Sequence, residues 1–152
     1  MTGKNLEDEL RRLGEGKPSD NLMTYLNNKA SKVEQEALES ARKLNEMRKS
    51  DKIERLASMR LDRGDLVGTI ELIPEINDGY YKADIYIKIS SKYIDLEDYT
   101  EAIKTLEKAH DAIENMKEGN EDNQTMQYIQ LLRFYHNVLC KLKEMKEEKS
   151  EE

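Results

Sequence analysis

Side chains able to perform chemistry are scarce in this sequence, and three of them stand out: His110, His136 and Cys140. The chain has two histidines and one cysteine. His136 and Cys140 are four residues apart, so a helix would bring an imidazole close to a thiol. A thiolate–imidazole pair is one hypothesis for these residues. The interpretation that we favour is a small buried thiol that only packs.

No other grouping of residues has the spacing of a catalytic or metal site. The histidines share no ligand-like interval with Cys140 or with a carboxylate cluster, so we expect no metal and no cofactor. A glycine-rich phosphate loop, a nucleophile elbow and a zincin motif are all missing from the sequence. Adjacent acids such as Glu97 and Asp98 fall at expected helix ends, where acids cap helices. The sequence therefore argues against an enzyme.

The composition is dominated by charge. Of the 152 residues, 38% are charged and 37% are hydrophobic, whereas typical domains have about 25% and about 45–50%. Such a thin core suits an elongated stack of helices better than a compact globule. The net charge is −7 with acids and bases interleaved, so no basic cluster is available to displace the counterions of a nucleic acid.

Hydrophobic runs and cysteine content limit the cellular environment. No apolar run exceeds four residues, so we expect no membrane-spanning helix and no membrane partner. A single cysteine cannot form an intramolecular disulfide framework. The first residues are charged and lack the apolar core of a signal peptide. We therefore expect a cytoplasmic protein.

The sequence repeats itself at an interval of 33 residues. Residues 53–73 align without gaps with residues 86–106. The matched pairs are Leu56 and Ile89, Ala57 and Ser90, Asp65 and Asp98, Leu66 and Tyr99, and Ile70 and Ile103. A period near 33 predicts stacked helix hairpins, in which one unit covers the apolar face of the next.

Glycines, prolines and capping residues predict where helices begin and end. A charged N-terminal arm is expected over residues 1–19, with a short helix over 6–13. Further helices are expected over 51–62, from 66 to Pro74, over 80–95, from 99 to a stop at 117–119, and over 126–145. Residues 120–125 are predicted to form a loop, and residues 147–152 a solvated tail that frays.

Residues 20–49 allow two interpretations. Asn27 and Asn28 could break the segment, and Ser31 with Glu34 has the spacing of a capping box, so we favour a hairpin with its second helix over 32–49. That helix would pack through the apolar stripe Val33, Ala37, Ala41, Leu44 and Met47. The alternative is one uninterrupted helix whose stripe, from Leu26 to Met47, is a coiled-coil seam.

The repeat resembles a tetratricopeptide repeat. That family's first helix has a large residue, Leu, a small residue and Tyr, and its second helix has Ala, a large residue and Ala. The matching residues here are Tyr86, Ile89, Ser90, Tyr93, Tyr99, Ala102, Leu106 and Ala109. The earlier unit matches through Leu56, Ala57, Gly64, Asp65 and Ile70 but departs at Arg60 and Thr69. The resemblance is strongest over residues 53–112.

The resemblance implies an all-α domain over residues 20–146, built as a stack of two to three antiparallel hairpins. A C-terminal capping helix would close it, with Tyr128, Leu131 and Tyr135 packed inward. A concave groove would be lined by first helices and would present Arg55, Ser58, Asp62, Asp84, Ile87, Lys88, Ser91, Ile94, Asp95 and Arg133. Family members that bind chaperone tails hold the terminal carboxylate with a Lys/Asn clamp. Glu54, Ser58, Ile87 and Ser91 stand there instead, so we expect no chaperone binding.

Two functions are consistent with these features. The first is a non-catalytic adaptor that binds a protein or peptide segment in the groove, with Ile87 and Ile94 as apolar anchors beside Lys88 and Asp95. Alternatively, a neighbouring helix covers both isoleucines. The second function is that of a structural subunit, which forms a homodimer or docks into a helical assembly through the stripe from Leu26 to Met47.

Overall fold

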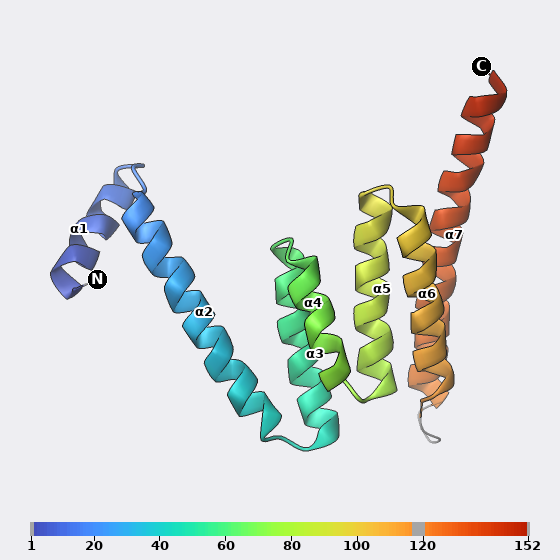
Figure 1. The fold of residues 1–152 in the computed structure, drawn as a ribbon, viewed down its shortest axis with the longest axis horizontal. Helices are drawn as coiled ribbons and strands as arrows, with labels where there is room; N and C mark the ends of the chain where they lie inside the picture. The colour runs from blue at the N-terminus through green and yellow to red at the C-terminus, as the bar shows by residue number, and fades with distance from the viewer. Residues whose placement is uncertain (1, 117–120, 152) are drawn as a thin grey trace. The chain divides into compact units, whose positions relative to one another are not determined.

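The computed structural model describes residues 2–116 and 121–151, and every regular element within these residues is a helix (Figure 1). The elements are α1 (Gly3–Gly14), α2 (Asp20–Arg42), α3 (Glu46–Asp62), α4 (Leu66–Leu72), a 3-10 turn η1 (Ile73–Glu75), α5 (Gly79–Asp95), α6 (Tyr99–Glu114) and α7 (Glu121–Glu151). The all-α prediction is confirmed. The predicted stop at 117–119 lies outside the described residues. Contacts divide the chain into two compact units, one up to Lys43 and one from Leu44 onward.

The first unit contains α1 and α2. Thr2 caps α1 and Ser19 caps α2, because each side-chain oxygen accepts a backbone N–H in the first turn. The Ser19 hydroxyl also donates to the carboxylate of Glu9, which ties the start of α2 to α1. Leu22 is buried near this contact, whereas α1 itself contains no buried residue. The predicted boundary after residue 19 differs from the division at Lys43.

The favoured break at Asn27 and Asn28 is wrong, since α2 continues through both residues to Arg42. An asparagine inside a helix costs only about 0.7 kcal/mol relative to alanine, which a long helix tolerates. The break falls instead before α3, where Asn45 accepts the N–H of Arg48 at 3.1 Å and caps the helix. The uninterrupted alternative is therefore correct as far as Arg42 and wrong beyond it.

The apolar stripe from Leu26 to Met47 is consequently divided between two helices in two units. Val33 on α2 is 53% exposed and Met47 on α3 is 63% exposed, so neither packs as the stripe predicted. Helix α2 ends at Arg42, with Lys43 as its C-cap. The spacing of the apolar residues does not reveal this break.

The second unit contains two hairpins, α3–α4 and α5–α6, that turn with the same backbone geometry. Gly64 and Glu97, which are repeat equivalents, both have positive φ angles, of 86° and 59°. Two hydrogen bonds close the first turn, from Gly64 N–H to Leu61 O and from Asp65 N–H to Arg60 O. The equivalent two bonds close the second turn, from Glu97 N–H to Ile94 O and from Asp98 N–H to Tyr93 O. Asp65 and Asp98 then cap the second helices, as predicted.

Small residues lie where the two helices of each hairpin cross. Ala57 and Thr69 are fully buried in the first hairpin, and Ser90 and Ala102 are fully buried in the second. The Thr69 hydroxyl lies 3.3 Å from Ala57 O, and the Ser90 hydroxyl lies 3.4 Å from Ala102 O. The threonine that departs from the repeat pattern is thus a core residue, whereas Ile70, predicted to pack, is 44% exposed.

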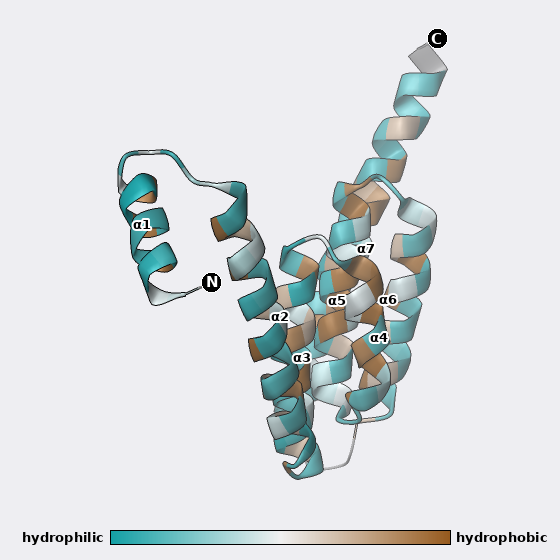
Figure 2. Cartoon of the chain, turned by 60° about the vertical axis from the view of Figure 1, so that its left-hand side comes forward, coloured by the Kyte–Doolittle hydropathy of each residue, from teal (hydrophilic) through white to brown (hydrophobic). Residues whose placement is uncertain are grey.

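The core of the second unit lies around α5, which packs against α3, α6 and α7. Figure 2 shows hydrophobic residues gathered along α5 and α6, with hydrophilic residues on the other faces. The core cluster comprises Ala83, Ile87, Ala102, Leu106, Ala109, Ala112, Ile113, Leu131 and Val138. Its last two members come from α7, which covers this cluster.

Helix α7 is longer than predicted. The predicted loop over 120–125 is helical from Glu121, and the tail predicted to fray is helical as far as Glu151. Glutamate and lysine are strong helix formers, so the charged end can continue the helix without packing. Of the three residues predicted to point inward, Leu131 is buried and Tyr135 packs against the core cluster, whereas Tyr128 is 39% exposed.

Candidate functional site

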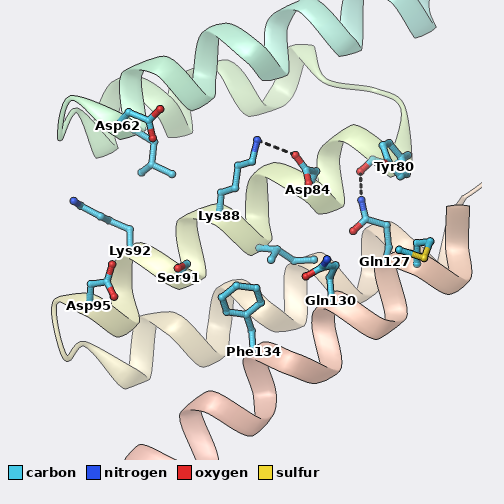
Figure 3. A pocket seen from close by; sticks show the side chains of 13 residues that line it. Asp62, Tyr80, Asp84, Lys88, Ser91, Lys92, Asp95, Gln127, Gln130 and Phe134 are labelled. Carbon is cyan, nitrogen blue, oxygen red and sulfur yellow. Dashed lines mark hydrogen bonds and ion pairs between the residues drawn. The ribbon is translucent and has the colours of Figure 1, made fainter.

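A groove opens in the second unit between α3, α5 and α7 (Figure 3). It has a volume of about 590 Å³ and is open to solvent. The lining residues are Leu61 and Asp62 from α3, Tyr80, Asp84, Ile87, Lys88, Ser91, Lys92 and Asp95 from α5, and Met126, Gln127, Gln130 and Phe134 from α7. The first helices of the two hairpins, α3 and α5, thus line it together with α7.

The base of the groove is apolar and well packed. Ile87 and Leu61 are almost fully buried, and Phe134 is partly buried against the core cluster. Gln127 is also buried, and its side-chain amide donates to the backbone carbonyl of Tyr80 at 3.1 Å. This bond joins α7 to the start of α5, so the side of the groove formed by α7 is held in place.

A cluster of charged side chains forms one wall. Lys88 Nζ lies 2.8 Å from Glu54 Oε1 and 3.1 Å from Asp84 Oδ2. Lys88 also donates to the Ser58 hydroxyl at 3.0 Å, and that hydroxyl donates to Glu54 at 2.9 Å. Because Glu54 belongs to α3 and Lys88 to α5, the cluster links the two hairpins.

Burial sets the ionisation of this cluster. The pKa of Glu54 is raised from 4.5 to about 7, chiefly by desolvation and also by the neighbouring Asp84, while Lys88 acts in the opposite direction. Burial lowers the pKa of Lys88, but the interactions with Glu54 and Asp84 outweigh this effect. The pKa of Lys88 therefore lies above its usual value. One ammonium thus faces two carboxyl groups, and a proton on Glu54 makes the cluster neutral.

Two unpaired acids stand at one end of the groove. Asp62 and Asp95 are exposed repeat equivalents, and neither forms an ion pair within the described part of the chain. Figure 3 shows both near Lys92, away from the end formed by Tyr80 and Gln127. With two carboxylates and one ammonium, this end carries excess negative charge.

The structure brings six of the ten predicted groove residues to the groove: Asp62, Asp84, Ile87, Lys88, Ser91 and Asp95. Ser58 does not line the groove and accepts a hydrogen bond from Lys88. Arg55 does not line it and pairs instead with Asp51 at 3.1 Å. Arg133 is exposed on α7 and does not line it either, whereas Gln130 does.

The role of Ile87 and Ile94 as exposed anchors has to be corrected. Ile87 is 5% exposed and belongs to the core cluster, although one edge of it reaches the base of the groove. Ile94 is partly buried against the same cluster and lines a separate hollow next to Met145. The alternative, that a neighbouring helix covers both isoleucines, holds because α7 packs on α5 and covers these apolar side chains.

Sequence reasoning missed Met126, Gln127 and Phe134, which α7 supplies to the groove. Phe134 is the only phenylalanine of the chain. Gln127, Gln130 and Phe134 follow one another at steps of three and four residues, which places them on one face of a helix. That spacing was the available signal.

The residues considered for chemistry lie apart from the groove. His110 Nε2 is 2.9 Å from a carboxylate oxygen of Glu114, and its ring meets Tyr128 edge-on. Cys140 is exposed, so the prediction of a buried thiol is wrong. Within residues 2–116 and 121–151, no group of His, Cys, Asp and Glu could hold a metal ion, and no helix is long and apolar enough to cross a membrane.

Fold and groove define an all-α protein with two consecutive hairpins of equal turn geometry and a long helix packed against the second. Comparisons with models of protein families, with curated proteins and with solved structures found no match for this chain.

Proposed function

We propose that this chain is a non-catalytic adaptor whose second unit is a tetratricopeptide-like stack, and that the groove between α3, α5 and α7 holds a segment of a partner protein. The observation that carries the proposal is the groove itself, with an apolar base, an unpaired charged end, and walls joined by a hydrogen bond and an ion pair. Grooves of this kind bind peptides through apolar contacts and select them through charge. The single cysteine suits a reducing compartment, so we place this role in the cytoplasm.

Charge indicates which segment fits best. Lys88 is already compensated by Glu54 and Asp84. The unpaired acids Asp62 and Asp95 outnumber Lys92 at their end of the groove. A complementary segment therefore presents an apolar side chain to the base and a lysine or arginine to that end.

Selection from a displayed library of random 12-residue peptides tests the proposal. Ser91 lies in the middle of the groove on α5, and in Ser91→Phe a bulky ring obstructs the space. The matched control is Thr100→Phe, an exposed position in the first turn of α6 outside the groove. We expect the wild type and Thr100→Phe to enrich the same basic, partly apolar peptides, and Ser91→Phe to bind them at least tenfold more weakly.

Two results would overturn the proposal: a wild-type protein that enriches no peptide, or a Ser91→Phe variant that binds the enriched peptides as well as the control does. A further variant tests the charge argument separately. Asp62→Asn with Asp95→Asn should retain apolar selection and lose the preference for lysine and arginine. Circular dichroism and melting temperature confirm that each variant is folded.

A further inference from the structure

Helix α7 exposes a row of large apolar side chains on the side that does not pack. The row consists of Ile129, Leu132 and Leu139, and we call it the outer strip of α7. Leu132 and Leu139 are 55% and 50% exposed, and Ile129 is 49% exposed. At about 100° per residue, the outer strip lies beside the face that carries Leu131 and Val138 into the core.

Helix α7 presents the outer strip while its other face packs on α5 and α6. The outer strip does not line the groove. A row of exposed apolar residues on one helix is typical of an interaction surface. The surface is thus separate from the groove, and it is available while the groove is occupied.

We propose that the outer strip is a dimer interface, on which a second copy of this chain packs its own α7 in the antiparallel direction. The spacing supports this arrangement. Leu132 and Leu139 are seven residues apart and lie on either side of His136, the middle residue of α7. A two-fold axis near His136 therefore packs Leu132 of each copy against Leu139 of the other, and the two helices overlap along their whole length.

Charge selects the antiparallel direction. The first turn of α7 is acidic, with Glu121 and Asp122. Lys143 and Lys146 lie on the same side of the helix as the outer strip, near the other end. With the two-fold axis near His136, antiparallel packing places Lys146 of one copy within about one helical turn of Asp122 of the other, and it also opposes the helix dipoles favourably. Parallel packing would place acids against acids and lysines against lysines.

The length of α7 makes the interface large enough. Its 31 residues extend about 46 Å at 1.5 Å per residue. With a contact width of about 10–12 Å, that of one helix, each copy buries on the order of 500 Å² and the pair on the order of 1,000 Å². This area lies at the lower end for specific association, so the dimer should be reversible.

Sedimentation of the full chain between about 1 and 200 µM, concentrations that span micromolar dissociation constants, tests the dimer. We expect a wild-type mass approaching twice 17.8 kDa at the highest concentration. Leu132→Glu with Leu139→Glu should weaken dimerisation at least tenfold, with unchanged circular dichroism. The matched control is Val67→Glu with Ile70→Glu, two exposed apolar residues on α4, which should leave the dimer intact.

Cross-linking tests the direction of the helices. In a Cys140→Ser background, His136→Cys places one thiol near the two-fold axis in each copy, and a short bismaleimide should join them. Lys143→Cys places the two thiols about 21 Å apart along the antiparallel pair, beyond the reach of that reagent. A parallel dimer would cross-link at both positions.

Three outcomes would overturn the proposal. One is a wild-type chain that remains monomeric at the highest concentration. Another is a dimer that survives the two glutamates on α7 but is lost in Leu26→Asp with Val33→Asp, which would assign the interface to α2. The third is efficient cross-linking at position 143, which would exclude the antiparallel arrangement.

Discussion

Glu97 occupies in the second hairpin the backbone position that Gly64 occupies in the first, and both have positive φ angles, of 59° and 86°. Each donates its N–H at 3.0 Å to the carbonyl three residues earlier, of Ile94 and Leu61 respectively. A left-handed conformation costs a residue with a side chain roughly 1 kcal/mol, whereas glycine adopts it freely. The repeat thus preserves a turn geometry even where the residue disfavours it.

Exchanging these two residue types should change stability in opposite directions. Glu97→Gly should raise the free energy of unfolding by about 0.5–1 kcal/mol. Relief of the strained φ stabilises the folded state, and the larger conformational entropy of glycine in the unfolded state offsets part of this gain. Gly64→Glu should lower the free energy of unfolding by about 1 kcal/mol. This loss comes from the strained backbone φ and not from a clash, because nothing lies within 4 Å of the added Cβ. Urea unfolding measures both, and Glu97→Ala, which keeps the strain, should gain less than Glu97→Gly.

The crossing of α5 and α6 should tolerate no larger side chain at Ala102, which is fully buried. Ala102→Phe should destabilise the protein by about 1–3 kcal/mol through overpacking. Lys104→Phe on the same helix, where the side chain is 64% exposed, should change stability by no more than about 0.5 kcal/mol. Equal losses in the two variants would mean that α6 presents a different face to α5.

Ile87 should behave as a core residue rather than as a binding anchor. Ile87→Ala should destabilise the protein by about 2–4 kcal/mol, since it leaves a cavity beneath α7. Val67→Ala, at a position that is 70% exposed on α4, should have an effect below about 0.5 kcal/mol. If Ile87→Ala instead kept full stability in thermal unfolding, α7 would not cover α5 in solution.

The pH dependence of stability should report on Glu54. Its pKa is raised from 4.5 to about 7 in the folded protein, so between these values the folded state holds a proton that the unfolded state has released. The stabilisation from this group is complete below pH 4.5 and is lost as the pH rises through 7. Urea unfolding at pH 5, 6, 7 and 8 should therefore show wild-type stability falling relative to Glu54→Gln.

The neighbours of Glu54 provide the control for that measurement. Asp84, Lys88 and Ser58 face it in the cluster and remain in the Glu54→Gln variant. Glu71→Gln changes an exposed carboxylate on α4, and its stability should follow the wild type at every pH. Parallel curves for wild type and Glu54→Gln would show that burial does not shift the ionisation of Glu54.

Local signals were enough to locate the hairpins. Asp65 and Asp98 cap α4 and α6 because a carboxylate before an apolar segment satisfies free backbone N–H groups without help from the rest of the fold. The 33-residue match likewise identified the second hairpin, since repeated residues make repeated local contacts. Signals of this local kind failed at Asn27 and Ser31, where a favourable capping sequence lies inside a continuous helix.

The sequence alone determined the all-helical class and the helix starts at Asp65 and Asp98. Through the repeat resemblance, it also predicted that Asp62, Asp84, Lys88 and Ser91 share one face of their helices. Tertiary packing decided what covers these faces. Ile87 and Lys88 are neighbours in the sequence, yet α7 buries the first and leaves the second partly exposed. The proton affinity of Glu54 likewise depends on residues 30 and more positions away, because desolvation and charge act through space rather than along the chain.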